Sequence, residues 1–182
     1  MIRIFDIFFS LLGLILFSPL LILIIIFGFF KNGSPLFKQQ RVGMNQKVFT
    51  LIKFRTMPKN TKSLPTHLIK NSSITPFQSA LRKTKLDELP QLLNVLLGQM
   101  SLVGPRPCLL NQNKLIKERK RRGVFNYKPG ITGLAQISGI NMKTPIILSK
   151  TDIKMMKKMS LYKYFYYIFF TLLVIFKKNY CN

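Results

Sequence analysis

The sequence predicts a mostly helical α+β fold built from three parts. Residues 1–32 are dominated by one long apolar stretch, which is typical of a membrane-inserted helix. Residues 33–160 are basic and mixed in polarity, and their short alternating runs predict a small domain with a few strands. Residues 161–182 combine aromatic, aliphatic and lysine side chains, which predicts a terminal amphipathic helix at a membrane interface.

The apolar stretch at residues 7–30 is interrupted at its centre. Its twenty-four residues would form a helix of about 36 Å, enough to cross a bilayer. Pro19 lacks a backbone donor, so the helix should bend there, and the hydroxyl of Ser18 can bond a carbonyl that the proline frees. Basic residues stand on both sides, at Arg3 and Lys31, whereas a spanning helix normally shows basic excess on one side. A kinked spanning helix and a re-entrant helix-break-helix both remain open.

Composition narrows the class of partner. The 182-residue chain carries a formal charge of +24 and has an isoelectric point near 10.5. Such a charge requires an anionic partner: nucleic acid, an anionic membrane surface or a phosphorylated substrate. The basic run at residues 117–122 resembles a nucleic-acid patch, but it lacks the interleaved aromatic residues that stack on bases. With two cysteines and one histidine, we expect neither a disulfide framework nor a histidine-rich metal site.

Two short strands are predicted at residues 37–43 and 47–55, around a turn at residues 43–45. Lys53 and Arg55 share one face of the second strand, a pattern that is also common on a hairpin edge with solvated charges. The polar stretch at residues 58–75 predicts a loop.

The stretch at residues 84–91 contains two of the chain's five carboxylates, side by side at Asp87 and Glu88. Nearby cations favour the ionised form of such a pair. The pair can bind Mg²⁺ through oxygen, or supply a carboxylate nucleophile to a phosphorus centre. The pattern Thr84-x-x-Asp87 also fits a helix cap, in which Asp87 serves only the backbone of Thr84. Catalysis and capping are both consistent with this stretch alone.

Helices are predicted on both sides of the carboxylate pair. The first runs from residue 76 to Arg82, and the second starts near Asp87 and runs to Gly98. Pro90 belongs in the first turn of the second helix, because proline is tolerated only there. Unpaired N–H groups at that helix start would suit a phosphate.

Two further segments suit anion binding. Arg106 stands between two prolines, which fix its backbone and can present its guanidinium to a phosphate; a rigid turn with a solvated arginine is the alternative. Residues 128–136 are rich in glycine and can bring backbone N–H groups to an anion, although a plain turn fits as well. Near the chain end, residues 162–176 predict either an interfacial helix or a buried core helix, since their strongly apolar part is too short to span.

Taken in order, these motifs resemble the bacterial sugar transferase family, the small monotopic phosphoglycosyl transferases that act on undecaprenyl phosphate. The matching stretches have family-like spacing and extend over nearly the whole chain. They are residues 3–6, 17–19, 39–43, 53–57, 81–95, 100–107 and 129–136.

The resemblance implies a re-entrant helix broken at Ser18 and Pro19, with both ends at the cytoplasmic face of the bacterial inner membrane. It implies an Mg²⁺-dependent reaction in two steps. The carboxylate of Asp87 attacks the β-phosphate of a UDP-sugar and releases UMP, and the phosphosugar then passes to undecaprenyl phosphate. Residues 33–160 would be the cytosolic catalytic domain, facing an anionic inner leaflet, and no nucleic acid is expected.

The resemblance also assigns the site residues. Asp87 is the nucleophile and a metal ligand, and Glu88 is its partner, as metal-site support or proton acceptor. The substrate-binding residues are Lys53, Arg82 and Arg106 near the phosphates, Thr132 and Gln136 on the nucleotide side, and Arg55.

Four positions depart from the family pattern. Lys85 stands where the family usually has serine, Gln99 where it has an acid, Leu134 where it has an aromatic residue, and Tyr164 where it has an acid. Because Asp87 and Glu88 are intact, we expect activity. A member that has lost catalysis and serves as a membrane partner, or a membrane-tethered nucleic-acid-binding protein, would be the alternative.

Overall fold

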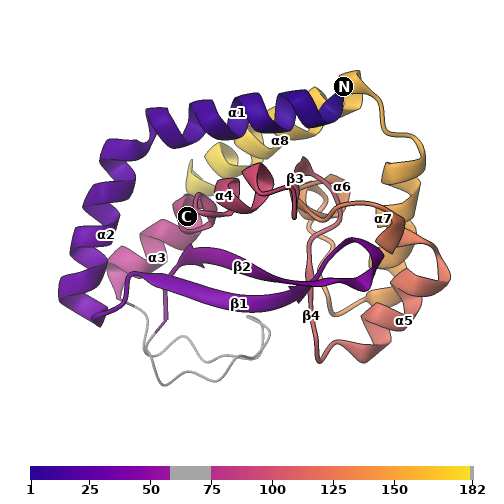
Figure 1. The fold of residues 1–182 in the computed structure, drawn as a ribbon, viewed down its shortest axis with the longest axis horizontal. Helices are drawn as coiled ribbons and strands as arrows, with labels where there is room; N and C mark the ends of the chain where they lie inside the picture. The colour runs from indigo at the N-terminus through magenta and orange to yellow at the C-terminus, as the bar shows by residue number, and fades with distance from the viewer. Residues whose placement is uncertain (58–74, 181–182) are drawn as a thin grey trace.

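The computed structural model describes residues 1–57 and 75–180, and it has the mostly helical α+β fold with short strands that the sequence predicts (Figure 1). The predicted loop at residues 58–75 lies outside the described residues except for its last position. Figure 1 shows α1 along one edge of the molecule with α8 behind it, and the β1–β2 hairpin crossing the opposite side.

The apolar N-terminal stretch forms two helices, α1 (Ile2–Leu16) and α2 (Ser18–Asn32), which meet at an angle of 62°. Pro19 cannot donate to the carbonyl of Ile15, and the hydroxyl of Ser18 donates to that carbonyl instead, at 2.7 Å. The predicted break and its hydrogen bond are therefore confirmed. Within the described part of the chain, neither helix alone has the length and hydropathy to cross a bilayer, whereas the bent pair together has both.

The larger sheet has the order β2-β1-β4. Strands β1 (Leu36–Val42) and β2 (Val48–Phe54) form the predicted hairpin, with Leu36 opposite Phe54 and Val42 opposite Val48. The turn between them contains η1 (Met44–Gln46), and the short strand β4 (Cys108–Leu109) pairs with the end of β1. A second sheet joins β3 (Ser101–Val103) and β5 (Gly130–Thr132) in parallel.

Asn94 fixes the free edge of β2 to the neighbouring helix. It belongs to α4 (Gln91–Leu96) and is fully buried. Its Oδ1 accepts a hydrogen bond from the N–H of Ile52 at 3.0 Å, and its Nδ2 donates to the carbonyl of Thr50 at 2.8 Å. Nδ2 also donates to Oε1 of Gln99 at 2.6 Å, so an amide at this departure position still supplies the acceptor that an acid would.

The carboxylate pair lies between two helices rather than at the start of one. Helix α3 (Pro76–Lys83) is followed by a separate turn, η4 (Leu86–Glu88), and α4 begins only after Pro90. The prediction of one helix from Asp87 to Gly98 was therefore wrong in both bounds. The capping alternative was also wrong, because the N–H and hydroxyl of Thr84 both donate to the carbonyl of Ala80 and end α3.

The remaining helices pack around the buried cores. They are α5 (Asn113–Arg121), η5 (Val124–Asn126), α6 (Leu134–Ile137), α7 (Pro145–Lys157) and α8 (Leu161–Tyr180). In α8, Tyr164 and Tyr167 are buried against α7 and β3, while Tyr162 and Phe169 are exposed. The helix is thus buried on one side only, and its predicted role at a membrane interface stays a prediction.

Two charged residues of α1 form hydrogen bonds with α4, β3 and α8. Oδ1 of the buried Asp6 accepts hydrogen bonds from the Ser101 hydroxyl at 3.0 Å, the Leu102 N–H at 2.9 Å and the Tyr164 hydroxyl at 2.9 Å. The guanidinium of Arg3 donates to the carbonyls of Val95 and Leu96, at the C-terminal end of α4. Arg3 therefore has a structural role, so its positive charge is weaker evidence for the orientation of the helix in a membrane.

We predict that Asp6→Ala destabilises the protein, because three buried donors on β3 and α8 lose one shared acceptor. The expected loss is about 3 kcal/mol, and the midpoint of thermal unfolding in detergent, followed by circular dichroism, should fall accordingly. Ile4→Ala, on the exposed face of the same helix, is the matched control and should change little. An unchanged midpoint for Asp6→Ala would show that the network does not hold α1.

Candidate active site

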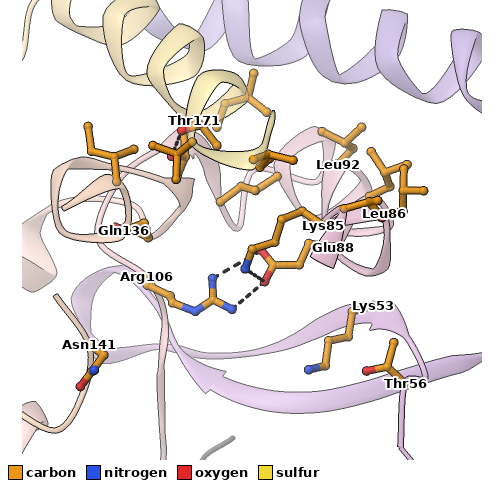
Figure 2. A pocket seen from close by; sticks show the side chains of 18 of the residues that line it. Lys53, Thr56, Lys85, Leu86, Glu88, Leu92, Arg106, Gln136, Asn141 and Thr171 are labelled. Atoms are coloured by element: carbon orange, nitrogen blue, oxygen red, sulfur yellow. Dashed lines mark hydrogen bonds and ion pairs between the residues drawn. The ribbon is translucent and has the colours of Figure 1, made fainter. Parts of the chain in front are cut away.

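A cleft of about 830 Å³ opens between the hairpin, the η4 turn, the β5–α6 segment and α8 (Figure 2). One side of it is polar, with five basic residues and one acidic residue, and the other is apolar. The polar side includes Gln39, Arg41, Lys53, Arg55, Thr56, Lys85, Glu88, Arg106, Thr132, Gln136, Asn141 and Thr171. The apolar side includes Phe17, Leu89, Leu92, Ile131, Ile137, Ile168, Leu172, Val174 and Ile175. Such a cleft suits a ligand with one anionic and one apolar part.

Glu88 is held by two cations at the centre of the polar side. Nη2 of Arg106 lies 2.7 Å from Oε1 of Glu88 and Nη1 lies 3.4 Å from Oε2, an asymmetric two-point contact. Nζ of Lys85 approaches the same Oε1 at 3.5 Å, and Figure 2 shows both cations converging on this carboxylate. Burial opposes ionisation, but the charges of Arg106 and Lys85 outweigh it and lower the pKa of Glu88 to about 2.

The pKa of Asp87 shifts in the opposite direction from that of Glu88. Its side chain is 6% exposed, and its Oδ1 is buried without a hydrogen-bond partner. Burial and the charge of Glu88 raise its pKa to about 6, although Lys53, Lys85 and Arg106 act in the other direction. Asp87 is therefore mostly ionised at neutral pH, and its buried carboxylate is poorly solvated.

The η4 turn that presents both carboxylates depends on Lys85. The backbone of Lys85 is left-handed, with φ of 62°, and it separates the end of α3 from η4. This conformation is uncommon for a residue with a Cβ. The Lys85 carbonyl accepts a hydrogen bond from the N–H of Glu88 at 3.0 Å, which closes the turn.

The structure brings Lys53 and Arg55 to the cleft, as predicted, but in different states. Burial lowers the pKa of Lys53 to about 8, and Asp87 opposes that shift. Its Nζ lies 5.4 Å from the centre of the Phe37 ring. The guanidinium of Arg55 donates to the carbonyls of Ser34 and Leu36, at 3.1 and 3.4 Å, so part of its donor capacity holds the start of β1.

Thr132 and Gln136 also line the cleft. The hydroxyl of Thr132 is hydrogen-bonded to that of Thr171 in α8, which itself donates to the carbonyl of Tyr167 at 2.7 Å. Gln136 donates from Nε2 to the carbonyl of Gly104 at 3.2 Å, while its buried Oε1 has no partner. That unpartnered acceptor is free to receive an N–H from a ligand.

Arg82 and Asp87 are not among the residues that line the cleft. Asp87 lies just beneath the surface, next to Glu88, which does line it. Arg82 is in the last turn of α3, and within the described residues the ion pairs of Glu88 are with Arg106 and Lys85 instead. The structure thus does not bring Arg82 to the polar cluster within the described residues.

Sequence reasoning missed several polar residues of the cleft, among them Arg41, Asn141 and Thr171. Arg41 donates from Nη1 to the carbonyl of Pro107 at 3.1 Å and from Nη2 to Gln39 at 2.7 Å. Burial, and then repulsion by Arg106, lowers its pKa to about 10, so it stays charged. The signal was available, because Phe37, Gln39 and Arg41 alternate along one strand and therefore face the same side.

A divalent cation fits this donor set in one way only. Within residues 1–57 and 75–180, no cluster of three or more histidine, cysteine or acidic side chains is present. Mg²⁺ normally keeps several waters and takes one or two carboxylates together with substrate phosphates. The unpartnered Oδ1 of Asp87 fits that role, whereas both oxygens of Glu88 are already paired. Asp87 and a bound diphosphate would therefore hold the ion together.

A buried carboxylate among cations, next to apolar side chains, is a site that suits a phosphorylated ligand with an apolar part. The comparison with known sequences agrees: the chain belongs to the bacterial sugar transferase family, whose profile matches residues 1–178. The predicted family is thereby confirmed.

Three relatives indicate the range of the family. The chain is 50% identical to an uncharacterized sugar transferase of Bacillus subtilis, over 61% of this chain and 55% of that protein. It is 40% identical to the undecaprenyl-phosphate galactose phosphotransferase of Salmonella typhimurium, over 76% and 33% of the two chains. It is 41% identical to the UDP-glucose:undecaprenyl-phosphate glucose-1-phosphate transferase of Klebsiella pneumoniae, over 75% and 30%. The matched region therefore spans between 30% and 55% of the length of these relatives.

The opposite pKa shifts of the two carboxylates predict stability changes of opposite sign. The folded-state pKa of Asp87, about 6, lies above its ordinary 3.8, so its ionisation costs stability as pH rises through that window. Asp87→Asn should raise the free energy of unfolding at pH 7.5 by up to about 3 kcal/mol, and the thermal midpoint should rise with it. The gain should vanish below about pH 4.

Glu88→Gln is the matched control. The folded-state pKa of Glu88, about 2, lies below its ordinary 4.5, so its charge stabilises the fold above that range. The substitution should lower the midpoint at pH 7.5. If both substitutions shift the midpoint in the same direction, the electrostatic assignment is wrong.

Proposed function

We propose that this protein transfers a phosphosugar from a UDP-sugar to undecaprenyl phosphate at the cytoplasmic face of the bacterial inner membrane. The observation that supports this most is the buried, unpartnered carboxylate of Asp87 among cations beside an amphipathic cleft. Family membership and the names of the Salmonella and Klebsiella relatives support the same reaction class.

In the first step, an oxygen of Asp87 attacks the β-phosphorus of the UDP-sugar. A bond forms between that oxygen and phosphorus, the bond from phosphorus to the bridging oxygen breaks, and UMP leaves with the electron pair. In the second step, a phosphate oxygen of undecaprenyl phosphate attacks the same phosphorus and restores the Asp87 carboxylate. Atoms and charge balance without a general acid, because both leaving groups are stable anions.

The other residues supply charge and position. Lys53, Lys85 and Arg106 neutralise the diphosphate, which is the principal demand of phosphoryl transfer. With a pKa of about 2, Glu88 is a poor proton acceptor, so its paired carboxylate serves to position Arg106 and Lys85. Mg²⁺, held by Asp87 and the diphosphate, would add further charge neutralisation. Gln136 and Thr132 would contact the nucleotide side, and Arg55 the phosphate side.

The membrane arrangement belongs to the same proposal. We take residues 1–32 as re-entrant, with the break at Ser18 and Pro19 inside the leaflet and both ends cytoplasmic. Phe17, at that break, and α8 supply the apolar wall of the cleft, where the first isoprene units would lie. The lysines of α7 and α8 would face the anionic lipid surface.

Nucleic acid is not a proposed partner. The basic run at residues 117–122 lies in and just after α5, and its charges are largely used within the protein. Glu118 pairs with Arg121 at 3.1 Å and Arg122 at 3.0 Å, and Arg119 is buried with Asp152. A run so paired has few cations left for a phosphate backbone.

We predict UMP release when the detergent-solubilised protein meets a panel of UDP-sugars, Mg²⁺ and polyprenyl phosphate. Asp87→Asn should abolish release, because an amide cannot form the bond to phosphorus. The rate should rise with pH around about 6, as Asp87 ionises, and fall above about 8, as Lys53 loses its charge. Lys53→Arg should remove the alkaline fall. Release by Asp87→Asn at the parental rate would refute the mechanism, and absence of release by the parent would favour a catalytically inactive partner protein.

For topology, we predict that cysteines replacing Ile4 and Gln40 are labelled from the same side of sealed membrane vesicles. Pro19→Leu should favour a spanning helix, because it restores a backbone N–H opposite the Ile15 carbonyl, which in the parent is bonded by the Ser18 hydroxyl, and should move the two labels to opposite sides. Opposite-side labelling in the parent would establish a spanning helix instead.

A further inference from the structure

The backbone that carries Arg106 is fixed at three consecutive carbonyls. The carbonyl of Pro105 accepts a hydrogen bond from the N–H of Gly130 at 2.9 Å, and that of Pro107 accepts one from Arg41 at 3.1 Å. Between them, the carbonyl of Arg106 accepts one from Nη1 of Arg119 at 2.7 Å. Because a proline has no N–H to donate, this segment depends on partners from elsewhere in the chain.

Arg119 reaches that carbonyl from inside the protein. It is 2% exposed, and its Nε and Nη2 both donate to Oδ2 of Asp152, at 3.1 and 2.7 Å. Asp152 in α7 is fully buried, and its Oδ1 has no partner. The Arg119 guanidinium thus joins α5, α7 and the backbone of Arg106. The guanidinium of Arg106 in turn donates to Glu88.

We propose that Arg119 is a positioning residue for the transfer reaction, acting through the Arg106 backbone on the Arg106–Glu88 pair. This inference rests on the proposed function. Arg119 touches neither carboxylate of the η4 turn in the described structure; its effect passes through one carbonyl. Asp152 accepts hydrogen bonds from Nε and Nη2 of Arg119, so that Nη1 of Arg119 is directed at the Arg106 carbonyl.

The small contribution of the buried Arg119–Asp152 ion pair to stability favours a positioning role for Arg119. A buried ion pair adds little stability compared with well-packed apolar residues of similar volume. The neighbouring core of Val42, Cys108, Leu115 and Leu148 could be extended by apolar side chains at both positions. Hydrophobic residues would not hold the Arg106 carbonyl, however, so the pair provides a function that packing alone does not.

The test separates positioning from stability. Arg119→Met combined with Asp152→Leu replaces the pair by apolar residues and should leave the unfolding midpoint near the parental value. It should nevertheless lower kcat/KM for UMP release by about 10- to 100-fold, mostly in kcat, because small misplacements of an orienting group are costly. Adding Arg106→Gln should then cost less than it costs in the parent, since both changes act through one group.

Two further variants keep the result interpretable. Arg119→Lys retains the charge opposite Asp152 but cannot serve Asp152 and the Arg106 carbonyl together, and it should lose activity without unfolding. Glu118→Gln combined with Arg122→Gln removes a partly buried pair from the same stretch, which does not contact the Arg106 backbone, and should keep parental activity. The proposal would be overturned if Arg119→Lys and the Arg119→Met, Asp152→Leu variant both kept the parental kcat/KM. It would also be overturned if the effects of the double variant and of Arg106→Gln were fully additive.

A separate readout does not depend on turnover. If Arg119 orients Arg106 toward Glu88, the loss of unfolding midpoint caused by Glu88→Gln should be smaller in the Arg119→Met, Asp152→Leu background than in the parent. This coupling tests the inference even where no UMP is released. An absence of release by the parent would refute the proposed function, whereas an absence of coupling would refute the role of Arg119.

Discussion

The pair between Glu88 and Arg106 is the interaction on which the rest of the site depends. It uses both oxygens of one carboxylate, so that the adjacent Asp87 is the carboxylate that remains unpartnered. Without Arg106, two neighbouring buried carboxylates would repel each other and Asp87 would take up a proton at higher pH. The same contact gives Glu88 a pKa of about 2 and leaves Asp87 at about 6, so two adjacent acids acquire different chemistry.

The fold secures that pair from two directions. From the N-terminal helix, Asp6 and Arg3 of α1 bind β3 and the end of α4, which keeps the apolar arm in contact with the domain that contains the cleft. From the interior, the carbonyls of residues 105–107 are held by partners on β5, α5 and β1. An apolar wall and a cationic wall thereby face each other across one cleft, which suits a lipid phosphate.

Local signals in the sequence were sufficient for the hairpin, the break at Pro19 and the carboxylate pair, because each depends on residues within a few positions of one another. The capping interpretation of Thr84 was wrong because α3 continues to Lys83, and both donors of Thr84 are used at its C-terminal end. Contacts between distant residues were not predictable: Arg119 meets Asp152 33 positions later, and Asp6 meets Tyr164 158 positions later. Arg82 shows the converse, since its nearness to Asp87 in the sequence did not bring it into the cleft.

The central claim is that Asp87 becomes bonded to a sugar phosphate during turnover. Protein mixed with a reactive UDP-sugar and Mg²⁺, without lipid acceptor, can be quenched, digested and weighed peptide by peptide. The account predicts that the peptide containing Asp87 gains the mass of one phosphosugar, and loses it when polyprenyl phosphate is added. If lipid-linked product accumulates while that peptide never gains the mass, the account is contradicted.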